Sequence, residues 1–261
     1  LKKENVKVHF RKEVNGLNLV TEDDKTICKG IFLEENGKKT AIAADCVIVA
    51  TGGMSYPSTG STGDGYQWAQ DAGLKVTALL PALVPFEAAE LETVKSLQGL
   101  SLKNVEAAIS NGKKELYRDF GEMLFTHFGV SGPLMLSASS FCAKAIGKTP
   151  LKLSIDLKPA LTEEQLDERI LRDFAEAKNK QFKNSLNHLY PAKLVPVIIE
   201  RSGIDPDKQV NEITKEERRH LVQSTKALTF TLTGLRPFKE AIITQGLSLI
   251  HISEPTRLRC I

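Results

Sequence analysis

The chain has 261 residues, of which 41% are hydrophobic, 26% charged and only 6% aromatic, a composition that excludes intrinsic disorder, collagen-like repeats and a disulfide scaffold. Lys and Arg number 35 against 32 Asp and Glu, for a net charge of +3, which is too small to predict nucleic acid or an anionic membrane as a partner. The length is sufficient to bury a substantial core, in one large domain or in two smaller ones.

The N-terminal part of the chain carries β-strand patterns. Val6, Val8 and Phe10 alternate with polar residues, which is typical of a half-buried strand. Asn36-Gly37 is a strong hairpin signal, because both residues adopt positive φ readily. Four short strands are therefore predicted, over residues 6–10, 17–21, 27–34 and 39–44.

A fully apolar run follows at residues 46–50. Such a run suits a strand that is covered on both faces, as in a parallel sheet with helices on each side. It leads directly into the glycine segment at residues 51–53. A helix is predicted from Asp64 to about Gly73, with Asp64 as its N-cap and Gly73 just after its last turn.

After this helix the pattern changes. Residues 86–157 are predicted to be β-rich, residues 162–222 helical and residues 227–233 extended. Two capping-box pairs mark helix starts, Thr162 with Gln165 and Thr214 with Glu217. The order predicts a mostly β unit, interrupted by a helical hairpin, inserted after a βα unit.

The first candidate site is the glycine segment Thr51, Gly52 and Gly53. Glycines at the carboxyl end of a parallel strand let a ligand approach the backbone closely, where doubly wound sheets bind their ligands. The same residues also fit a tight strand-to-loop turn without a ligand.

The second candidate is the loop from Thr59 to Gly65, which holds three glycines, three hydroxyls and a carboxylate. It is not a P-loop, because no Lys follows the last Gly. Asp64 would repel a phosphate at the helix N-terminus, so ribityl or ribose hydroxyls or a flavin ring edge suit the loop better. The alternative is that Asp64 is only a helix cap.

The third candidate is His127, which lies between two Phe and close to two Gly. Its imidazole could donate a proton or contact a polar substrate, because histidine titrates near neutrality. A lone His in an apolar stretch is also commonly a structural residue, and the sequence leaves both readings open.

The cysteines show no CxxC spacing and have no His cluster beside them. We therefore expect buried free thiols in a reducing compartment, and no metal site. They are Cys28, Cys46, Cys142 and Cys260. The sequence shows no signal-peptide pattern and no apolar run near the roughly 20 residues of a membrane span, so we expect a cytoplasmic protein with no membrane partner.

Four motifs occur in order along residues 1–246. They are ATGGMSYPSTGSTGDGYQWAQDAG, PALVPF, GEMLFTHFGVSGP and AIITQG. Together they resemble the BaiN-like family of NAD(P)/FAD-dependent oxidoreductases, bacterial flavoproteins that include 3-dehydro-bile-acid reductases. The resemblance is specific for the family and says little about the substrate.

The resemblance implies an α/β fold with a Rossmann-like FAD-binding domain and an inserted domain, part β-barrel-like and part helical. In these terms residues 1–80 form the FAD-binding domain, residues 81–238 the insert (β-rich over 81–157 and 224–238, helical over 159–223), and residues 239–246 the return to the FAD-binding domain.

The resemblance also implies roles for single residues. The cofactor-binding positions would be Val14, Thr51, Gly52, Gly53, Thr62, Gly63, Asp64 and Gly65. Val14 resembles the position whose backbone contacts adenine in related flavoproteins. His127 would be the catalytic or substrate-contacting group, in a segment of the insert that faces the active site.

Two departures from the family pattern stand out. The family begins with a strand, a glycine-rich loop and a helix that bind the FAD pyrophosphate, and this chain contains no G-x-G-x-x-G. Residues 247–261 fit no part of the pattern and are interpreted as a non-native tail, the alternative being a genuine divergent C-terminus. We therefore expect the middle of a longer flavoenzyme, without the FAD loop and the C-terminal segment, that binds FAD poorly by itself.

The expected function of the longer protein is to move a hydride between NAD(P)H, FAD and an organic substrate, for example one with an activated C=C bond. The expected partner is a small-molecule substrate and not a nucleic acid, and the sequence leaves the oligomeric state unknown. The alternative is a non-catalytic flavin-binding sensor or a binding module related to RNA modification, although RNA binding should bring a basic stripe that the charge pattern lacks.

Overall fold

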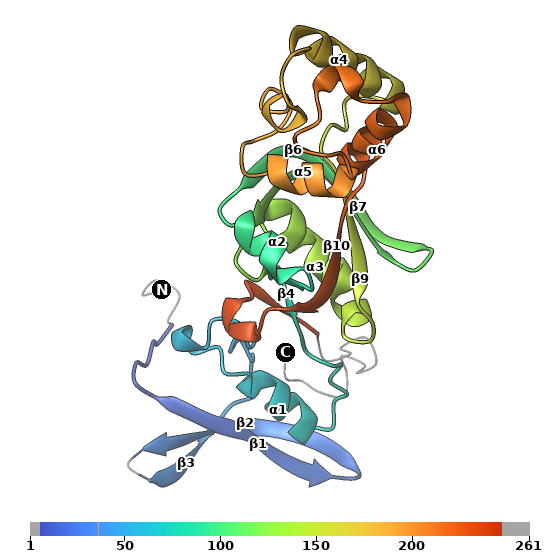
Figure 1. Ribbon diagram of the computed structural model, residues 1–261. Helices are drawn as coiled ribbons and strands as arrows, with labels where there is room; N and C mark the ends of the chain where they lie inside the picture. The colour runs from blue at the N-terminus through green and yellow to red at the C-terminus, as the bar shows by residue number, and fades with distance from the viewer. Residues whose placement is uncertain (1–5, 36, 247–261) are drawn as a thin grey trace. The chain divides into compact units, whose positions relative to one another are not determined.

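The structure, a computed structural model, describes residues 6–35 and 37–246. The chain divides into two compact units (Figure 1). Unit 1 consists of Leu1–Leu79 and Thr244–Ile261, and unit 2 of Leu80–Ile243. The expected tail at 247–261, the first five residues and Asn36 of the hairpin signal lie outside the described residues.

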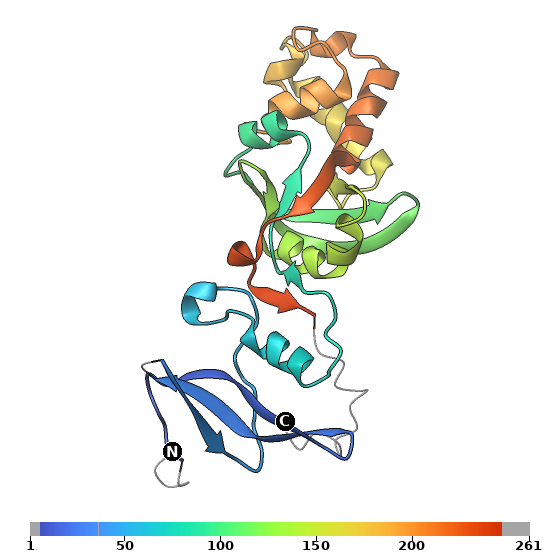
Figure 2. The same ribbon diagram turned by 90° about the horizontal axis from the view of Figure 1, so that it is seen from below.

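Unit 1 contains a three-stranded antiparallel sheet (Figure 2). Its strands are β1 (Glu13–Glu22), β2 (Lys25–Glu35) and β3 (Lys38–Ala43), in that order. The three predicted strands from residue 17 to residue 44 are thereby confirmed, and Gly37 in the turn has φ 74°. The short helix η2 (Pro57–Thr59) and the helix α1 (Asp64–Asp71) follow the sheet in the chain.

Two predicted strands of unit 1 are wrong. Residues 6–10 form no strand, and Phe10 is 82% exposed; the left-handed φ of 58° at Arg11 interrupts the extended backbone before β1. Residues 46–50 also form no strand, and Ile48 is 77% exposed. A strand requires a hydrogen-bonded neighbour, and no strand within 6–35 and 37–246 pairs with this run.

Helix α1 begins one residue later than its expected cap. Gly63 is the N-cap, with φ 91°, and Asp64 is the first helical residue. The prediction of Asp64 as the N-cap is therefore wrong, although its carboxylate still lies in the first turn, where it stabilises the helix dipole. At the other end Ala72 is the C-cap, and Gly73 follows with φ 79°, as predicted.

Unit 2 is built around a closed six-stranded barrel with the order β10-β5-β8-β7-β6-β9. Its strands are β5 (Phe86–Ala88), β6 (Ser101–Asn111), β7 (Lys114–Phe125), β8 (Gly129–Ser131), β9 (Leu151–Asp156) and β10 (Leu228–Leu235). Alternate residues point inward, so that Ile109, Phe125, Leu153 and Phe230 are fully or almost fully buried. Two short strands mark the boundaries of the units along the chain. Strand β4 (Leu80–Ala82) begins unit 2, and β11 (Ile243–Gln245) runs from the last residue of unit 2 into unit 1.

Residues 86–157, which the sequence predicts to be β-rich, also contain two helices. Besides α2 (Leu91–Ser96), the 14-residue helix α3 (Pro133–Ile146) follows β8 and packs on the barrel. Seven of its residues are buried. The start signal was present, because Pro133 occupies the first turn after Gly132, but the apolar, serine- and alanine-rich run shows no clear helical face.

A helical part is inserted between β9 and β10. It contains α4 (Glu163–Glu176), α5 (Val195–Ser202) and α6 (Lys215–Lys226), with the short helices η3 (Phe182–Asn184) and η4 (Val210–Glu212), and both views show these helices gathered at one end of the barrel (Figures 1 and 2). Both capping boxes are confirmed, at Thr162 and Thr214. Lys226 ties α6 to β9 through an ion pair of 2.5 Å with Asp156.

Cysteine burial differs from the expectation at one position. Cys28 and Cys142 are buried free thiols, and burial raises the pKa of Cys142 to about 11. Cys46 is exposed, because it belongs to the unpaired run at residues 46–50. Cys260 lies outside the described residues. In the part of the chain that the structure describes, no helix combines the length and the apolar character needed to cross a bilayer.

Candidate functional site

The glycine segment and the polar loop of unit 1 are in direct contact. A Cβ on Gly52 would lie 2.6 Å from Ser61 Oγ, and a Cβ on Gly65 would lie 2.5 Å from Thr51 Oγ1. Both distances are shorter than real Cβ contacts, so a Cβ at either glycine would force the Ser61 or the Thr51 side chain to move, and the two segments pack closely where these residues are glycines. The structure therefore brings the first and second candidate sites together as one cluster, residues 51–54 against residues 61–65, which we call the glycine cluster.

The polar side chains of the loop are held locally. Thr62 Oγ1 donates a hydrogen bond of 2.6 Å to Asp64 Oδ2, and Gly63 lies against Met54, whose Cγ would be 3.1 Å from a Cβ at that position. Thr62 and Asp64 are exposed. The loop thus presents a carboxylate and a hydroxyl to solvent at the start of α1.

A residue far along the sequence completes the cluster. Thr244 Oγ1 accepts a hydrogen bond of 2.8 Å from the Met54 N–H and lies 3.1 Å from Ser55 Oγ. A Cβ on Gly53 would lie 2.7 Å from the same hydroxyl oxygen. Thr244 belongs to the AIITQG motif but has no predicted role, because its partners Met54 and Ser55 lie 190 and 189 residues earlier in the chain.

A buried polar atom next to Thr244 tests whether the unit can accept a polar ligand. Gln245 Oε1 is buried, and none of the described residues donates a hydrogen bond to it. An unsatisfied buried acceptor costs about 1–3 kcal/mol, so the hydroxyl or N–H of a ligand would stabilise it. The hydroxyls of a ribityl chain, or the single N–H of an oxidised isoalloxazine ring, would meet this requirement.

Val14 lies on β1, opposite Leu33 of β2, and its role at the adenine stays a prediction.

In unit 2, His127 occupies a tight turn between β7 and β8. The Thr126 N–H donates to the Gly129 carbonyl (2.9 Å), and the Gly129 N–H donates back to Thr126 Oγ1 (3.1 Å). The Phe128 carbonyl accepts from the Ala88 N–H of β5 at 3.0 Å. The residues around His127 are thus fixed at the backbone, while the His127 side chain is exposed.

Aromatic and charged side chains surround the turn. The His127 ring packs edge-on against Phe128, with centroids 4.9 Å apart, and the Arg236 guanidinium lies over the Phe128 ring at 4.5 Å. Arg236 also pairs with Glu87 at 2.8 Å and Glu240 at 2.7 Å. Hydrogen bonding to Arg236, more than its charge or the charges of Lys239 and His127, lowers the pKa of Glu240.

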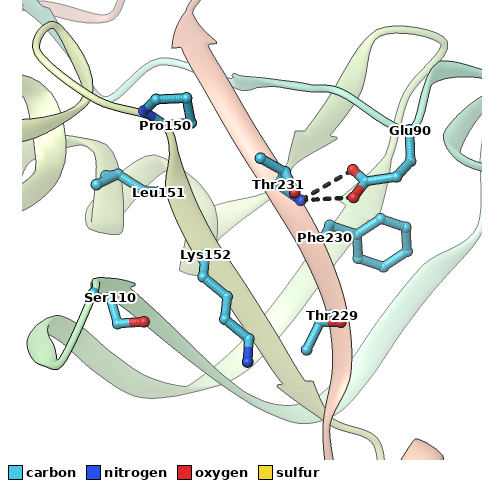
Figure 3. Close-up of a pocket in the computed structure, with 9 residues that line it drawn as sticks. Glu90, Ser110, Pro150, Leu151, Lys152, Thr229, Phe230 and Thr231 are labelled. Carbon is cyan, nitrogen blue, oxygen red and sulfur yellow. Dashed lines mark hydrogen bonds between the residues drawn. The ribbon is translucent and has the colours of Figure 1, made fainter.

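A hollow lies on the outer face of the barrel (Figure 3). It has a volume of about 300 Å³ and follows a row in which Ser110, Lys152 and Thr231 stand opposite one another on β6, β9 and β10. The carboxylate of Glu90 accepts hydrogen bonds from the Thr231 N–H at 3.0 and 3.1 Å. None of the predicted site residues lines this hollow.

Two family profiles match the chain. Residues 80–243 match the profile described as HI0933-like protein barrel and H2TH domain. Residues 1–103 match the profile described as FAD binding domain.

Three curated relatives are similar to the chain over most of its length. The ribosomal RNA dihydrouridine synthase of Haemophilus influenzae is 31% identical over 92% of the chain and 55% of that protein. The 3-dehydro-bile acid delta(4,6)-reductase of Clostridium scindens is 26% identical over 94% of the chain and 58% of that protein. The ribosomal RNA dihydrouridine synthase of Escherichia coli is 28% identical over 94% of the chain and 56% of that protein. The chain thus spans somewhat more than half the length of these relatives.

Proposed function

The chain belongs to the family of HI0933-like proteins with a barrel and H2TH domain, and from this premise we propose that its protein is an FAD-dependent oxidoreductase. The match of residues 1–103 to an FAD binding domain carries the proposal. The family resemblance drawn from the four motifs is confirmed by these matches. FAD, when bound, supplies the redox chemistry, while the protein orients the substrate and excludes water.

The glycine cluster supports a cofactor role for unit 1. Thr51, Gly52 and Gly53 would line the cofactor crevice, and the loop residues Thr62, Gly63, Asp64 and Gly65 would lie near the flavin, with Val14 at the adenine. The close packing of the two segments and the unsatisfied Gln245 Oε1 favour this assignment. We further propose that the FAD-binding domain is Rossmann-like, with unit 1 as an incomplete part of it.

The reaction that we propose is hydride transfer from NADH or NADPH, through the flavin, to an activated C=C bond. The names of the relatives support this class, because a dihydrouridine synthase and a delta(4,6)-reductase both denote enzymes that saturate C=C bonds. His127 is the proposed proton donor or substrate contact, since its imidazole is exposed and the backbone of its turn is held by hydrogen bonds. We place the protein in the cytoplasm, without a membrane partner.

The substrate is either a small enone or a uridine in RNA. The charge pattern favours a small molecule. The names of two relatives favour RNA, which makes RNA the second candidate and stands against the expectation of no nucleic-acid partner. A non-catalytic flavin-binding or RNA-binding module is the alternative without turnover.

The first experiment is to purify the full-length protein, release its cofactor by heat and record the absorption spectrum and chromatographic mobility. We expect FAD. A colourless protein that cannot be reconstituted with FAD would contradict the proposal. Gly65→Ala, which introduces a Cβ 2.5 Å from Thr51 Oγ1, should weaken FAD binding. The control is Gly147→Ala in unit 2, where φ is -66° and the new Cβ would meet only the Ala143 carbonyl oxygen at 3.8 Å, and it should leave FAD binding unchanged.

The second experiment follows NADH and NADPH oxidation with two substrates, a steroid enone and a uridine-containing ribosomal RNA. Turnover of one of them identifies the substrate class, and an FAD-loaded protein inactive on both favours the sensor. His127→Ala is expected to lower kcat about a hundredfold, as for the loss of a proton donor. Unchanged turnover in this variant would reduce His127 to a structural residue.

A further inference from the structure

The His127 turn is supported by a layered arrangement of side chains from three segments of unit 2. The His127 imidazole packs against one part of the Phe128 ring, and the Arg236 guanidinium covers the ring at 4.5 Å from its centroid. The sequence predicted only His127, because nothing in an isolated Arg236 more than 100 residues later marks it as a neighbour.

Arg236 is itself held from several directions. Its Nε and Nη2 donate to the two carboxylate oxygens of Glu240 at 3.0 and 2.7 Å, and its Nη1 donates to Glu87 at 2.8 Å. Its backbone N–H donates to the Pro85 carbonyl at 3.0 Å. A guanidinium with its donors engaged in its own plane has one orientation, so its face over Phe128 is fixed.

The backbone of the turn is held by hydrogen bonds, whereas the His127 side chain can adopt different orientations. Residues 126, 128 and 129 are tied by the hydrogen bonds within the turn and to Ala88, whereas the His127 ring is exposed. An exposed ring on a fixed backbone still has a choice of rotamers. The Phe128 ring packs against the imidazole, and the Arg236 guanidinium lies over the Phe128 ring.

We propose that Arg236 is a positioning residue, which acts through Phe128 to hold the His127 imidazole in one orientation for its role in the reaction. This inference rests on the proposed function for the role of His127, but its geometric part is independent of that function. Positioning matters for rate because small displacements of a catalytic group reduce turnover strongly.

Glu87 and Glu240 are part of the same arrangement. They hold the guanidinium by its edge, from β5 and from the short helix η5 (Phe238–Glu240). Lys239 also lies close enough to Glu240 for its positive charge to lower the pKa of that carboxyl, after the larger effect of the hydrogen bond from Arg236.

The test compares Arg236→Met with Arg118→Met in the full-length, FAD-loaded protein. Methionine keeps the length of the arginine stem and removes the charge and the fork of donors. Arg118 is the matched control, because it also pairs with two glutamates, Glu106 and Glu115, on the surface of unit 2. Phe128→Leu is a second variant that removes the ring and keeps an apolar side chain.

The direct measurement is the NMR chemical shift of the His127 ring protons in protein with labelled histidine. The His127→Gln variant assigns these signals, because they disappear from its spectrum. The Phe128 ring current displaces these signals in the native protein, and Arg236→Met and Phe128→Leu are expected to return them toward the values of a free histidine. Arg118→Met should leave them in place. Unchanged signals in both Arg236→Met and Phe128→Leu would overturn the inference, whatever the turnover assay shows.

Turnover gives the second measurement. Arg236→Met is expected to lower kcat about tenfold with little change in KM, because misorientation affects the reaction more than ground-state binding. A change in KM alone would overturn the positioning role in catalysis. If His127→Ala leaves turnover unchanged while Arg236→Met still moves the His127 signals, the proposed function of His127 fails and the geometric part of the inference holds.

Discussion

At Gly129 the backbone of β8 passes so close to β5 that a side chain has no room. A Cβ there would lie 2.9 Å from the Ala88 nitrogen and closer still to the Phe86 carbonyl oxygen. These neighbours are backbone atoms of the paired strand, so they cannot rotate away as a flexible side chain would. Gly129 therefore allows β8 to pair with β5. It also closes the His127 turn, so the pairing of these strands holds one end of that turn.

Gly129→Ala is expected to lower the free energy of unfolding by about 3 kcal/mol, in the upper range for overpacking a core. Gly147→Ala is the matched control, since a Cβ at Gly147 would meet only ordinary contact, 3.8 Å from the Ala143 carbonyl oxygen. Urea unfolding of both variants checks the prediction. Equal stability of the two would show that β8 can move away from β5.

The capping boxes of α4 and α6 differ in the residue that closes them. In α4 the box is closed by Gln165, and in α6 by Glu217. Glu217 also accepts hydrogen bonds from Lys208 Nζ at 2.7 and 2.9 Å. The hydrogen bond from Lys208, followed by the one from the Thr214 N–H, holds the pKa of Glu217 below the usual value of a glutamate.

Glu217→Gln keeps the cap, as Gln165 shows, and removes the charge. Because the pKa is lowered in the folded state, the ion pair stabilises α6 at pH values above the unfolded pKa and loses this effect as the pH falls through the folded pKa. We expect a loss of about 0.5 kcal/mol at neutral pH, as for a partly exposed pair, and a smaller difference in acid. Urea unfolding at both pH values measures it, with Glu216→Gln as control.

Elements with local signals were predictable, and elements that depend on distant partners were not. The caps at Thr162 and Thr214 and the hairpin at Gly37 are decided by neighbouring residues. Residues 46–50 had a strong apolar pattern, yet a strand also needs a partner, which no local pattern supplies. The same holds for the candidate site. The glycine loops were predicted from local sequence, whereas the contacts of Thr244 and Arg236 are with residues far away in the chain and could not be predicted from it.

The two units of the molecule differ in the size of their cores. In the described part of unit 1 the buried apolar residues are Cys28, Leu33 and Ala72. Unit 2 has a continuous core of barrel and helix side chains that includes Phe86, Met135 and Leu166. Since buried apolar area is the main stabilising term, unit 2 carries most of the stability.

We therefore expect limited trypsin digestion of the 261-residue chain to degrade unit 1 first and to leave a resistant fragment close to residues 80–243. That fragment, expressed separately, should unfold cooperatively in urea, because it contains the whole barrel. Mass spectrometry of the digest and urea unfolding of the fragment are the measurements. Simultaneous loss of both units during digestion would contradict the difference in core size.

The insertion of the helical part between β9 and β10 has a consequence for synthesis on the ribosome. β10 pairs with both β5 and β9, so these two strands remain open edges on the nascent chain until α4, α5 and α6 have been translated. The helices can form early from local contacts, whereas the barrel cannot close before β10 leaves the exit tunnel. Open strand edges pair readily with other chains, so slow translation between β9 and β10 would lengthen the period in which this protein is most prone to aggregate.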